Sequence, residues 1–285
     1  MSKSNQTYKE LAIPYFKEVF DIIDEVMLKL NVPYYLIGAS AIALELLKDG
    51  IKPSRGTKDI DFAIMISSIQ EFETIVKELG NHGFNKVEAP WTLYNDKLNV
   101  VIDLLPFGEI EEKFTANFNK RYTDLHVLGF SEVLQEPETV RIEEKFVQIP
   151  SLQGMVILKL IAWSDRPEER DSDLGDILRI IEHYFSLNLD EIVEYHNDIF
   201  PDEGELDQLK IAARVLGRKA SKFLKVSEAI NERILKTINE NVINIKYSSI
   251  AKQWIRNKDW SLEYAVEILE EFKLGLVEND IIKGK

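Results

Sequence analysis

The feature that most constrains the fold of this chain is a change of pattern near Pro150. Before Pro150, stretches typical of strands alternate with stretches typical of helices. From Ser151 onward the apolar residues recur with helical spacing, and strand signals are nearly absent. Mixed elements favour a sheet with flanking helices, whereas a run of helices favours helix-on-helix packing. We therefore predict an α+β chain with a mixed-sheet α/β domain over residues 1–150 and an all-helical C-terminal domain over residues 151–285.

The order of elements in the first domain follows from periodicity and from turn residues. Apolar residues recur with helical spacing before Pro33, whereas the run from Asp59 to Ile66 alternates between its two faces. Gly38 separates a short apolar run from the next helical segment. The expected elements are helices over 15–30, 39–48 and about 68–80, strands over 34–37, 59–66, 91–95 and 98–105, and a strand-rich segment over 124–149.

The composition excludes several kinds of chemistry. The 285-residue chain has no cysteine, so disulfides and thiolate catalysis are excluded, and its 4 histidines show no metal-ligand spacing. The net charge of −14 would repel a polyanion at long range, so any contact with nucleic acid must be local. No apolar run approaches the roughly 20 residues that span a bilayer, and the N-terminal segment lacks the apolar core of a signal peptide. We expect a cytoplasmic protein that has no membrane contact and uses carboxylate chemistry.

Aspartates at the start of the 59–66 strand form the first candidate site. Asp59 and Asp61 are separated by one residue, so on a strand their side chains project from the same face. Neighbouring carboxylates repel each other unless a cation lies between them, and a divalent, oxygen-binding ion such as Mg²⁺ suits that position. The Asp-x-Asp pattern is also common in proteins without a metal, so the assignment depends on further residues.

Asp103 supplies a third carboxylate. It is the only charged residue between Leu98 and Phe107, and a lone charge in an apolar strand is costly unless it is paired or binds a metal. The alternatives are a carboxylate that faces water from an edge strand and one that pairs with a lysine or arginine. With Asp59 and Asp61, it is predicted to be a catalytic residue and a ligand of Mg²⁺ or Mn²⁺.

A glycine turn and a basic loop flank these carboxylates in sequence. Gly38 and Ser40 stand at a strand-to-helix turn, where backbone N–H groups and a hydroxyl would bind phosphate. Arg55 and Thr57 lie in the loop that leads directly into Asp59, where Arg55 would pair with a phosphate or with an aspartate. The alternatives are a simple tight turn and a solvated loop. We predict that these residues bind nucleotide.

These motifs, taken in order, resemble the nucleotidyltransferase superfamily, which has the polymerase-beta-like fold. The segments that carry the resemblance are LIGAS at 36–40, KDIDFAI at 58–64 and VIDLLPF at 101–107. This chain departs from the family's motif in two ways: the usual second glycine or serine is Ala39, with Ser40 one residue later, and the gap from Gly38 to Asp59 is longer than in compact members. The resemblance implies a fold with metal-binding aspartates on neighbouring strands, a divalent cation and an NTP substrate.

A second resemblance extends into the helical half. The pattern R-x-T-x-D-I-D at 55–61 is similar to the AbiEii/AbiGii-type nucleotidyltransferases, the toxins of type IV toxin–antitoxin pairs. The family's later motifs correspond to LKLIAWSDR at 158–166 and DLGDI at 173–177. The resemblance implies roles for Lys159 in catalysis and for Arg166 and Asp176 in nucleotide binding. It also implies an RNA 3′ end or a protein hydroxyl as acceptor, and an antitoxin partner.

The residues themselves leave alternatives open in this segment. Lys159 has only apolar neighbours, so its ammonium should point into a polar cleft between the domains, towards phosphate or an aspartate, or else reach solvent along the helix surface. Asp173 and Asp176 stand at an expected helix start, where Asp173 would be the N-cap of a capping box. Capping and catalysis are both compatible with this pattern.

A basic stripe in the helical half bears on the acceptor. Lys210, Arg214, Arg218 and Lys222 recur every four residues and would form a cationic ridge on one helix, suited to a triphosphate or to the backbone of tRNA or another RNA. The alternative is a solvated helix face. The overall acidity instead suits a cationic small molecule, as in aminoglycoside-modifying relatives of the same fold. Two other interpretations remain. One is a non-catalytic nucleotide-binding module, which has no need for clustered, mutually repulsive carboxylates, and the other is a purely structural protein.

Overall fold

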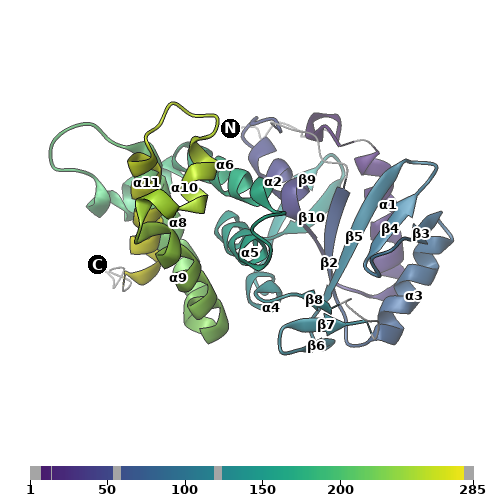
Figure 1. Ribbon diagram of the computed structural model, residues 1–285. Coiled ribbons are helices and arrows are strands. Elements are labelled where there is room, and N and C mark those ends of the chain that lie inside the picture. The colour runs from purple at the N-terminus through teal and green to yellow at the C-terminus, as the bar shows by residue number, and fades with distance from the viewer. Residues whose placement is uncertain (1–7, 14, 54–58, 119–123, 279–285) are drawn as a thin grey trace. The chain divides into compact units, whose positions relative to one another are not determined.

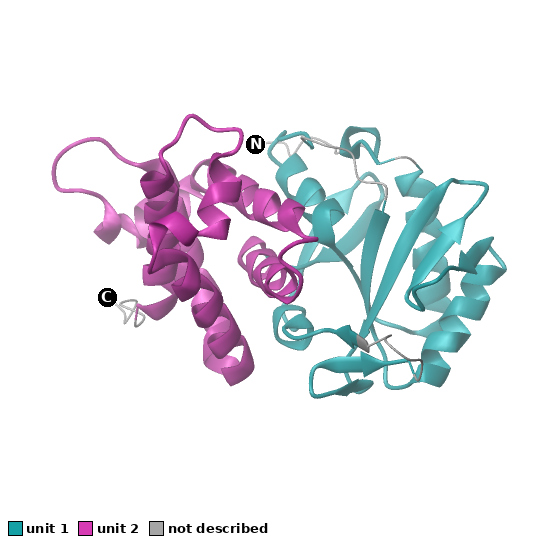
Figure 2. Cartoon of the chain, viewed as in Figure 1, with its two compact units in different colours: residues 1–151 teal, residues 152–285 magenta. Residues whose placement is uncertain are grey.

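The structure, a computed structural model, describes residues 8–13, 15–53, 59–118 and 124–278 (Figure 1). Arg55 and Thr57, which the sequence assigns to nucleotide binding, lie outside the described residues. The chain divides into two compact units, Met1–Ser151 and Leu152–Lys285 (Figure 2). Each unit has its own buried core, and each is described separately below.

A five-stranded mixed sheet forms the centre of the first unit, with the strand order β1-β2-β5-β4-β3. β2 and β5 run parallel, although they are distant in sequence, and the other neighbours are antiparallel. The parallel pair therefore lies in the middle of the sheet. The strands are β1 (Tyr34–Ile37), β2 (Asp59–Met65), β3 (Phe84–Lys86), β4 (Thr92–Asn95) and β5 (Val100–Phe107).

One face of this sheet is mostly apolar. Side chains that alternate along β2 and β5 on this face, such as Phe62 and Ile102, have no solvent exposure. The amphipathic helices α1 (Phe16–Leu30) and α3 (Ile69–Gly80) supply the aromatic residues that cover it. Phe20 of α1 packs against Phe62, with ring centroids 6.4 Å apart. Burial of this face holds the strands in register, because a slip by one residue would expose it.

The opposite face carries the carboxylates at one end and a small apolar cluster at the other. That cluster contains Ile37, Ala63, Phe107, Val127 and Leu134, all buried. The remaining elements of the first unit are η1 (Tyr8–Leu11), α2 (Gly38–Leu47), α4 (Phe130–Val133), the strands β6 (Glu111–Glu112), β7 (Thr115–Asn117) and β8 (Asp124–His126), and the hairpin of β9 (Glu138–Ile142) and β10 (Lys145–Ile149).

The second unit is helical throughout its described part. Two of its helices, α8 and α11, approach so closely that a Cβ on Gly217 would overlap the carbonyl oxygen of Phe272, and a Cβ on Gly275 would overlap that of Arg214. The elements are α5 (Leu152–Asp165), α6 (Asp171–Leu187), α7 (Leu189–Tyr195), η2 (Asn197–Ile199), α8 (Gln208–Val226), α9 (Glu228–Val242), η3 (Ile245–Tyr247), α10 (Ser249–Ile255) and α11 (Leu262–Val277).

The predicted fold class, α+β with a mixed sheet and a helical C-terminal region, is confirmed. The alternating run at the Asp-x-Asp motif is β2, and the predicted strand over 98–105 is β5, displaced by two residues at each end. The segment 124–149, expected to be strand-rich, also contains α4. Within the described residues, every helix is either too short or too polar to cross a bilayer.

Candidate functional site

Two aspartates lie side by side at the centre of the sheet. In the parallel register of β2 and β5, Asp61 is the direct partner of Asp103, so both side chains project from the same face. Asp59 lies two residues before Asp61 on β2, so its side chain projects from the same face. Asp61 and Asp103 are half-buried, whereas Asp59 is exposed at the start of β2. The three aspartates singled out in the sequence thus lie on one face of two neighbouring strands.

Gly38 lies against the carboxylate of Asp61. Ile37, the residue before Gly38, pairs with Asp61 between β1 and β2. The chain then turns into α2 at Gly38, whose φ is +67°. A Cβ at this position would overlap Oδ2 of Asp61. Glycine is therefore required twice here, for the left-handed backbone and for the space that the carboxylate fills. The helix start and the carboxylate of β2 are in direct contact.

Ser40, in the first turn of α2, is fully buried. Its hydroxyl oxygen has no hydrogen-bond partner among the residues that the structure describes. A buried hydroxyl normally finds a partner, so an orphaned one in the turn next to Gly38 is consistent with a ligand or water there. The nucleotide-binding role of Gly38 and Ser40 remains a prediction.

Thr92 is a site residue that the sequence reasoning missed. It lies on β4 directly opposite Asp103, and its hydroxyl donates a hydrogen bond of 2.6 Å to Oδ1 of Asp103. Nothing in the local sequence around Thr92 marks it, because its position depends on the antiparallel register of β4 and β5. Asp103 is therefore flanked by a carboxylate on one neighbouring strand and by a hydroxyl on the other.

The chemistry of this donor set fits a magnesium ion. Among the described residues, no cluster of three or more His, Asp or Glu side chains has the arrangement of a metal site complete in itself. Mg²⁺, however, is commonly held by one or two carboxylates together with substrate phosphates. The oxygens of Asp61 and Asp103, adjacent to the glycine-lined start of α2, provide that kind of incomplete set. Asp61 and Asp103 would hold the ion, and Asp59 lies at the exposed margin.

Lys159, the proposed catalytic lysine, is bound to two aspartates within the second unit. Its ammonium lies 2.6 Å from Oδ1 of Asp173 and 2.7 Å from Oδ2 of Asp176, and its side chain is 12% exposed. Burial by itself would lower the pKa of Lys159, but the charges of Asp176 and Asp173 outweigh it and raise that pKa above its usual value. The two aspartates thus stabilise the charged form of Lys159, and its catalytic role remains a prediction.

The start of α6 differs from the predicted capping box. The helix begins at Asp171 with Arg170 as its N-cap residue, so Asp173 lies inside the first turn and is not the N-cap. Asp173 and Asp176 are both buried and face Lys159. Asp173 and Asp176 therefore belong to a buried ion cluster with Lys159, and neither is the N-cap of α6.

Arg166, assigned to nucleotide binding, lies at the end of α5 beside Glu169. Its NH1 is 3.7 Å from Oε2 of Glu169, and half of its side chain is exposed. A long, exposed contact of this kind contributes little. The proposed contact of Arg166 with nucleotide remains a prediction.

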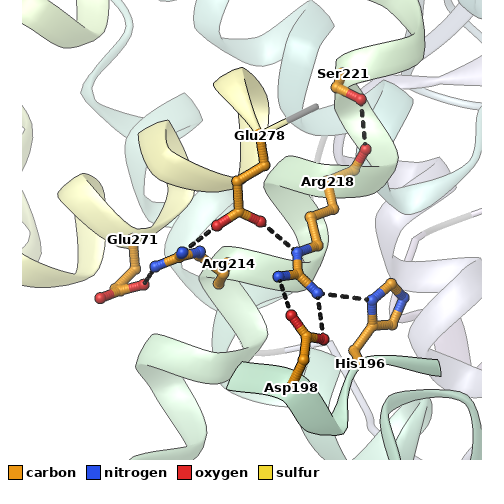
Figure 3. A network of polar contacts seen from close by, with 7 residues as sticks. All are labelled: His196, Asp198, Arg214, Arg218, Ser221, Glu271 and Glu278. Carbon is orange, nitrogen blue, oxygen red and sulfur yellow. Dashed lines mark hydrogen bonds and ion pairs between the residues drawn. The ribbon is translucent and has the colours of Figure 1, made fainter. Parts of the chain in front are cut away.

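Three of the four residues in the basic stripe on α8 are paired with acidic residues, and the fourth, Lys222, is exposed with its ammonium 5.1 Å from the centroid of the Phe223 ring. Lys210 lies 2.7 Å from Glu267, and Arg214 lies 2.8 Å from Glu271, both on α11. Arg214 and Arg218 also pair with Glu278, and Arg218 is held by Asp198 at 2.6 Å (Figure 3). The sequence could not show this, because the partners lie far along the chain. An RNA contact through these residues would first have to break the ion pairs.

The comparisons with known proteins give only distant structural likeness. No protein-family model matches the chain, and no curated protein sequence is significantly similar to it. The fold is similar to an antigenic nucleotidyltransferase-like protein from Paracoccidioides brasiliensis, with 17% identity, coverage of 80% of this chain and 95% of that chain, and a TM-score of 0.40.

Two further solved structures show a similar, weaker likeness. One is ANT(2'')-Ia in complex with adenylyl-2''-tobramycin, with 15% identity, coverage of 76% of this chain and 97% of that chain, and a TM-score of 0.37. The other is the CdnE cyclic dinucleotide synthase of Elizabethkingia meningoseptica with GTP and Apcpp, with 11% identity, coverage of 95% and 94%, and a TM-score of 0.31. Identities and TM-scores this low indicate similarity of fold and do not indicate the function of this chain.

Proposed function

We propose that this protein is a metal-dependent nucleotidyltransferase that moves an NMP from an NTP to a hydroxyl acceptor. The observation that carries the proposal is the register of β2 and β5, which sets the carboxylates of Asp61 and Asp103 side by side next to Gly38. Neighbouring carboxylates repel each other, and a divalent cation held between them would offset that repulsion. The magnesium ion, when bound, would offset charge on the phosphates and on the attacking oxygen.

The roles of the protein's own residues follow from this placement. Asp61 and Asp103 hold the cation, with Asp59 at the margin of the site, and Asp103 also accepts the proton of the acceptor hydroxyl. The acceptor oxygen forms a bond to the α-phosphorus, the bond from that phosphorus to the bridging oxygen breaks, and pyrophosphate leaves. Gly38 and Ser40, at the start of α2, bind the phosphate tail through backbone N–H groups and the hydroxyl.

The acceptor follows from two different arguments. The resemblance to type IV toxins favours an RNA 3′ end or a protein hydroxyl, with an antitoxin as partner. The pairing of Lys210, Arg214 and Arg218 with carboxylates, in a chain of net charge −14, favours a cationic small molecule such as an aminoglycoside as the second candidate. Purified protein incubated with each labelled NTP, first with total RNA and then with aminoglycosides, would distinguish the two acceptors.

Variants of the central aspartates test the proposal directly. Asp61→Asn and Asp103→Asn keep the size of each side chain and remove its charge, and we expect label transfer to fall by about 100-fold or more. Asp202→Asn is the control, because Asp202 lies exposed in a loop of the second unit. Full transfer by both site variants would show that the two carboxylates do not carry the chemistry.

A further inference from the structure

Asp103 is held from the side of β4 by a hydroxyl that the proposed reaction does not yet use. β5 lies between β2 and β4, so Asp103 has Asp61 opposite it on one side and Thr92 on the other. The hydroxyl of Thr92 donates to Oδ1 of Asp103 at 2.6 Å, a short distance typical of a bond to an ionised carboxylate. One oxygen of Asp103 is therefore fixed on the β4 side.

This contact bears on how Asp103 faces a ligand. A carboxylate rotates easily about its last bond, and repulsion from Asp61 would turn it away from the position that a shared cation needs. A donor that holds Oδ1 on the β4 side favours an orientation with the other oxygen on the side of Asp61. Groups that orient a metal ligand in this way affect metal affinity without touching the metal.

We propose that Thr92 is a positioning residue, whose hydroxyl orients the Asp103 carboxylate for binding the divalent cation. The inference rests on the nucleotidyltransferase function proposed above. The competing explanation is that Thr92 only stabilises the sheet, since threonine is favourable on strands and half-buried at this position. The two explanations differ in what valine would do, because valine keeps the shape and the strand preference of threonine and lacks the hydroxyl.

The test measures Mn²⁺ binding as well as turnover. Mn²⁺ affinity is measured by titration calorimetry on the wild type, Thr92→Val and Thr92→Ser, with melting temperatures for each. Thr139→Val is the matched control, since Thr139 is also a strand threonine in the first unit whose hydroxyl accepts a hydrogen bond, from Gln148 on the β9–β10 hairpin. We expect Thr92→Val to weaken Mn²⁺ binding by roughly 10-fold or more and to lower kcat, with little change in KM for the NTP.

The outcomes separate the two proposals. Recovery of Mn²⁺ affinity in Thr92→Ser, with melting temperatures of the valine and serine variants close together, would support the positioning role. Wild-type affinity in Thr92→Val, or an equal loss in Thr139→Val, would overturn the inference and leave the proposed function intact. A wild-type protein that binds no Mn²⁺ and transfers no nucleotide would overturn the proposed function and the inference together.

Discussion

At the scale of single residues, the site depends on one missing side chain as much as on the charged ones. Gly38 meets Asp61 so closely that the smallest side chain would displace the carboxylate. Its positive φ adds a second constraint, because residues other than glycine are strained there. These two constraints can be separated by experiment, because Gly50 also has a positive φ but has no close neighbour at the position of a Cβ.

We predict that Gly38→Ala displaces Asp61 and weakens Mn²⁺ binding by roughly 10-fold or more, as expected when a metal ligand loses its orientation. Gly50→Ala is the matched control, because Gly50 also has a positive φ, of +78°, and a Cβ there would meet nothing within 4 Å. Both variants should lose about 1 kcal/mol from backbone strain. Equal Mn²⁺ affinities in the two variants would show that the contact with Asp61 is unimportant.

Lys159 provides a second prediction at this scale. Lys159→Met removes the ammonium that lies between Asp173 and Asp176 and leaves both buried carboxylates without it. Breaking a buried ion cluster by removing one partner typically costs about 3–5 kcal/mol, and we expect a loss of this size in the free energy of unfolding, measured with urea. The triple variant with Lys159→Met, Asp173→Asn and Asp176→Asn should recover part of the lost free energy of unfolding. A loss below about 1 kcal/mol in the single variant would contradict a structural role for this cluster.

At the scale of elements, the close approach of α8 and α11 depends on glycines. Gly217 faces the carbonyl oxygen of Phe272 across the helix pair, and the ion pairs of Arg214 and Arg218 with Glu271 and Glu278 follow the same interface (Figure 3). Small residues at such a crossing let the backbones meet, and long side chains then pair along the seam. The close packing of these helices thus brings Arg214 and Arg218 within reach of their acidic partners.

We predict that Gly217→Ala destabilises the second unit by about 3 kcal/mol or more, because its Cβ would meet backbone that cannot move aside. Gly175→Ala, on α6, is the control, since a Cβ there would meet nothing within 4 Å. Alanine in an open helix position should stabilise by up to about 1 kcal/mol. Urea denaturation of both variants measures the difference, and the same sign of change in both would contradict the close packing.

His196 makes the same region sensitive to acid. Burial and the nearby charge of Arg218 lower the pKa of His196 below its ordinary 6.5. As the pH falls below 6.5, the unfolded chain takes up a proton at this residue before the folded chain does, so the free energy of unfolding decreases. We expect His196→Asn to lose less stability than the wild type between about pH 7.5 and pH 5.5, measured by urea denaturation. Parallel losses in the two proteins would contradict this assignment.

At the scale of the whole molecule, the sequence predicts what depends on local pattern. The α+β class, β2 with its aspartates and the turn at Gly38 all follow from periodicity and residue type. Contacts between distant segments could not be predicted. The hydrogen bond from Thr92 to Asp103 needs the register of β4 and β5, and the acidic partners of Arg214 come from a helix near the C-terminal end. Residue types therefore indicate the candidate site, and only the fold shows what surrounds it.

The parallel pairing of β2 with β5 has a consequence for folding kinetics. The two strands become neighbours only after the chain between them, with α3, β3 and β4, has closed a long loop. Closing such a loop costs entropy before any contact compensates for it, so pairings of this kind form late and slowly. The carboxylates of Asp61 and Asp103 consequently come together only after this loop has closed. During synthesis, a nascent chain that ends before β5 therefore carries Asp61 without Asp103 beside it.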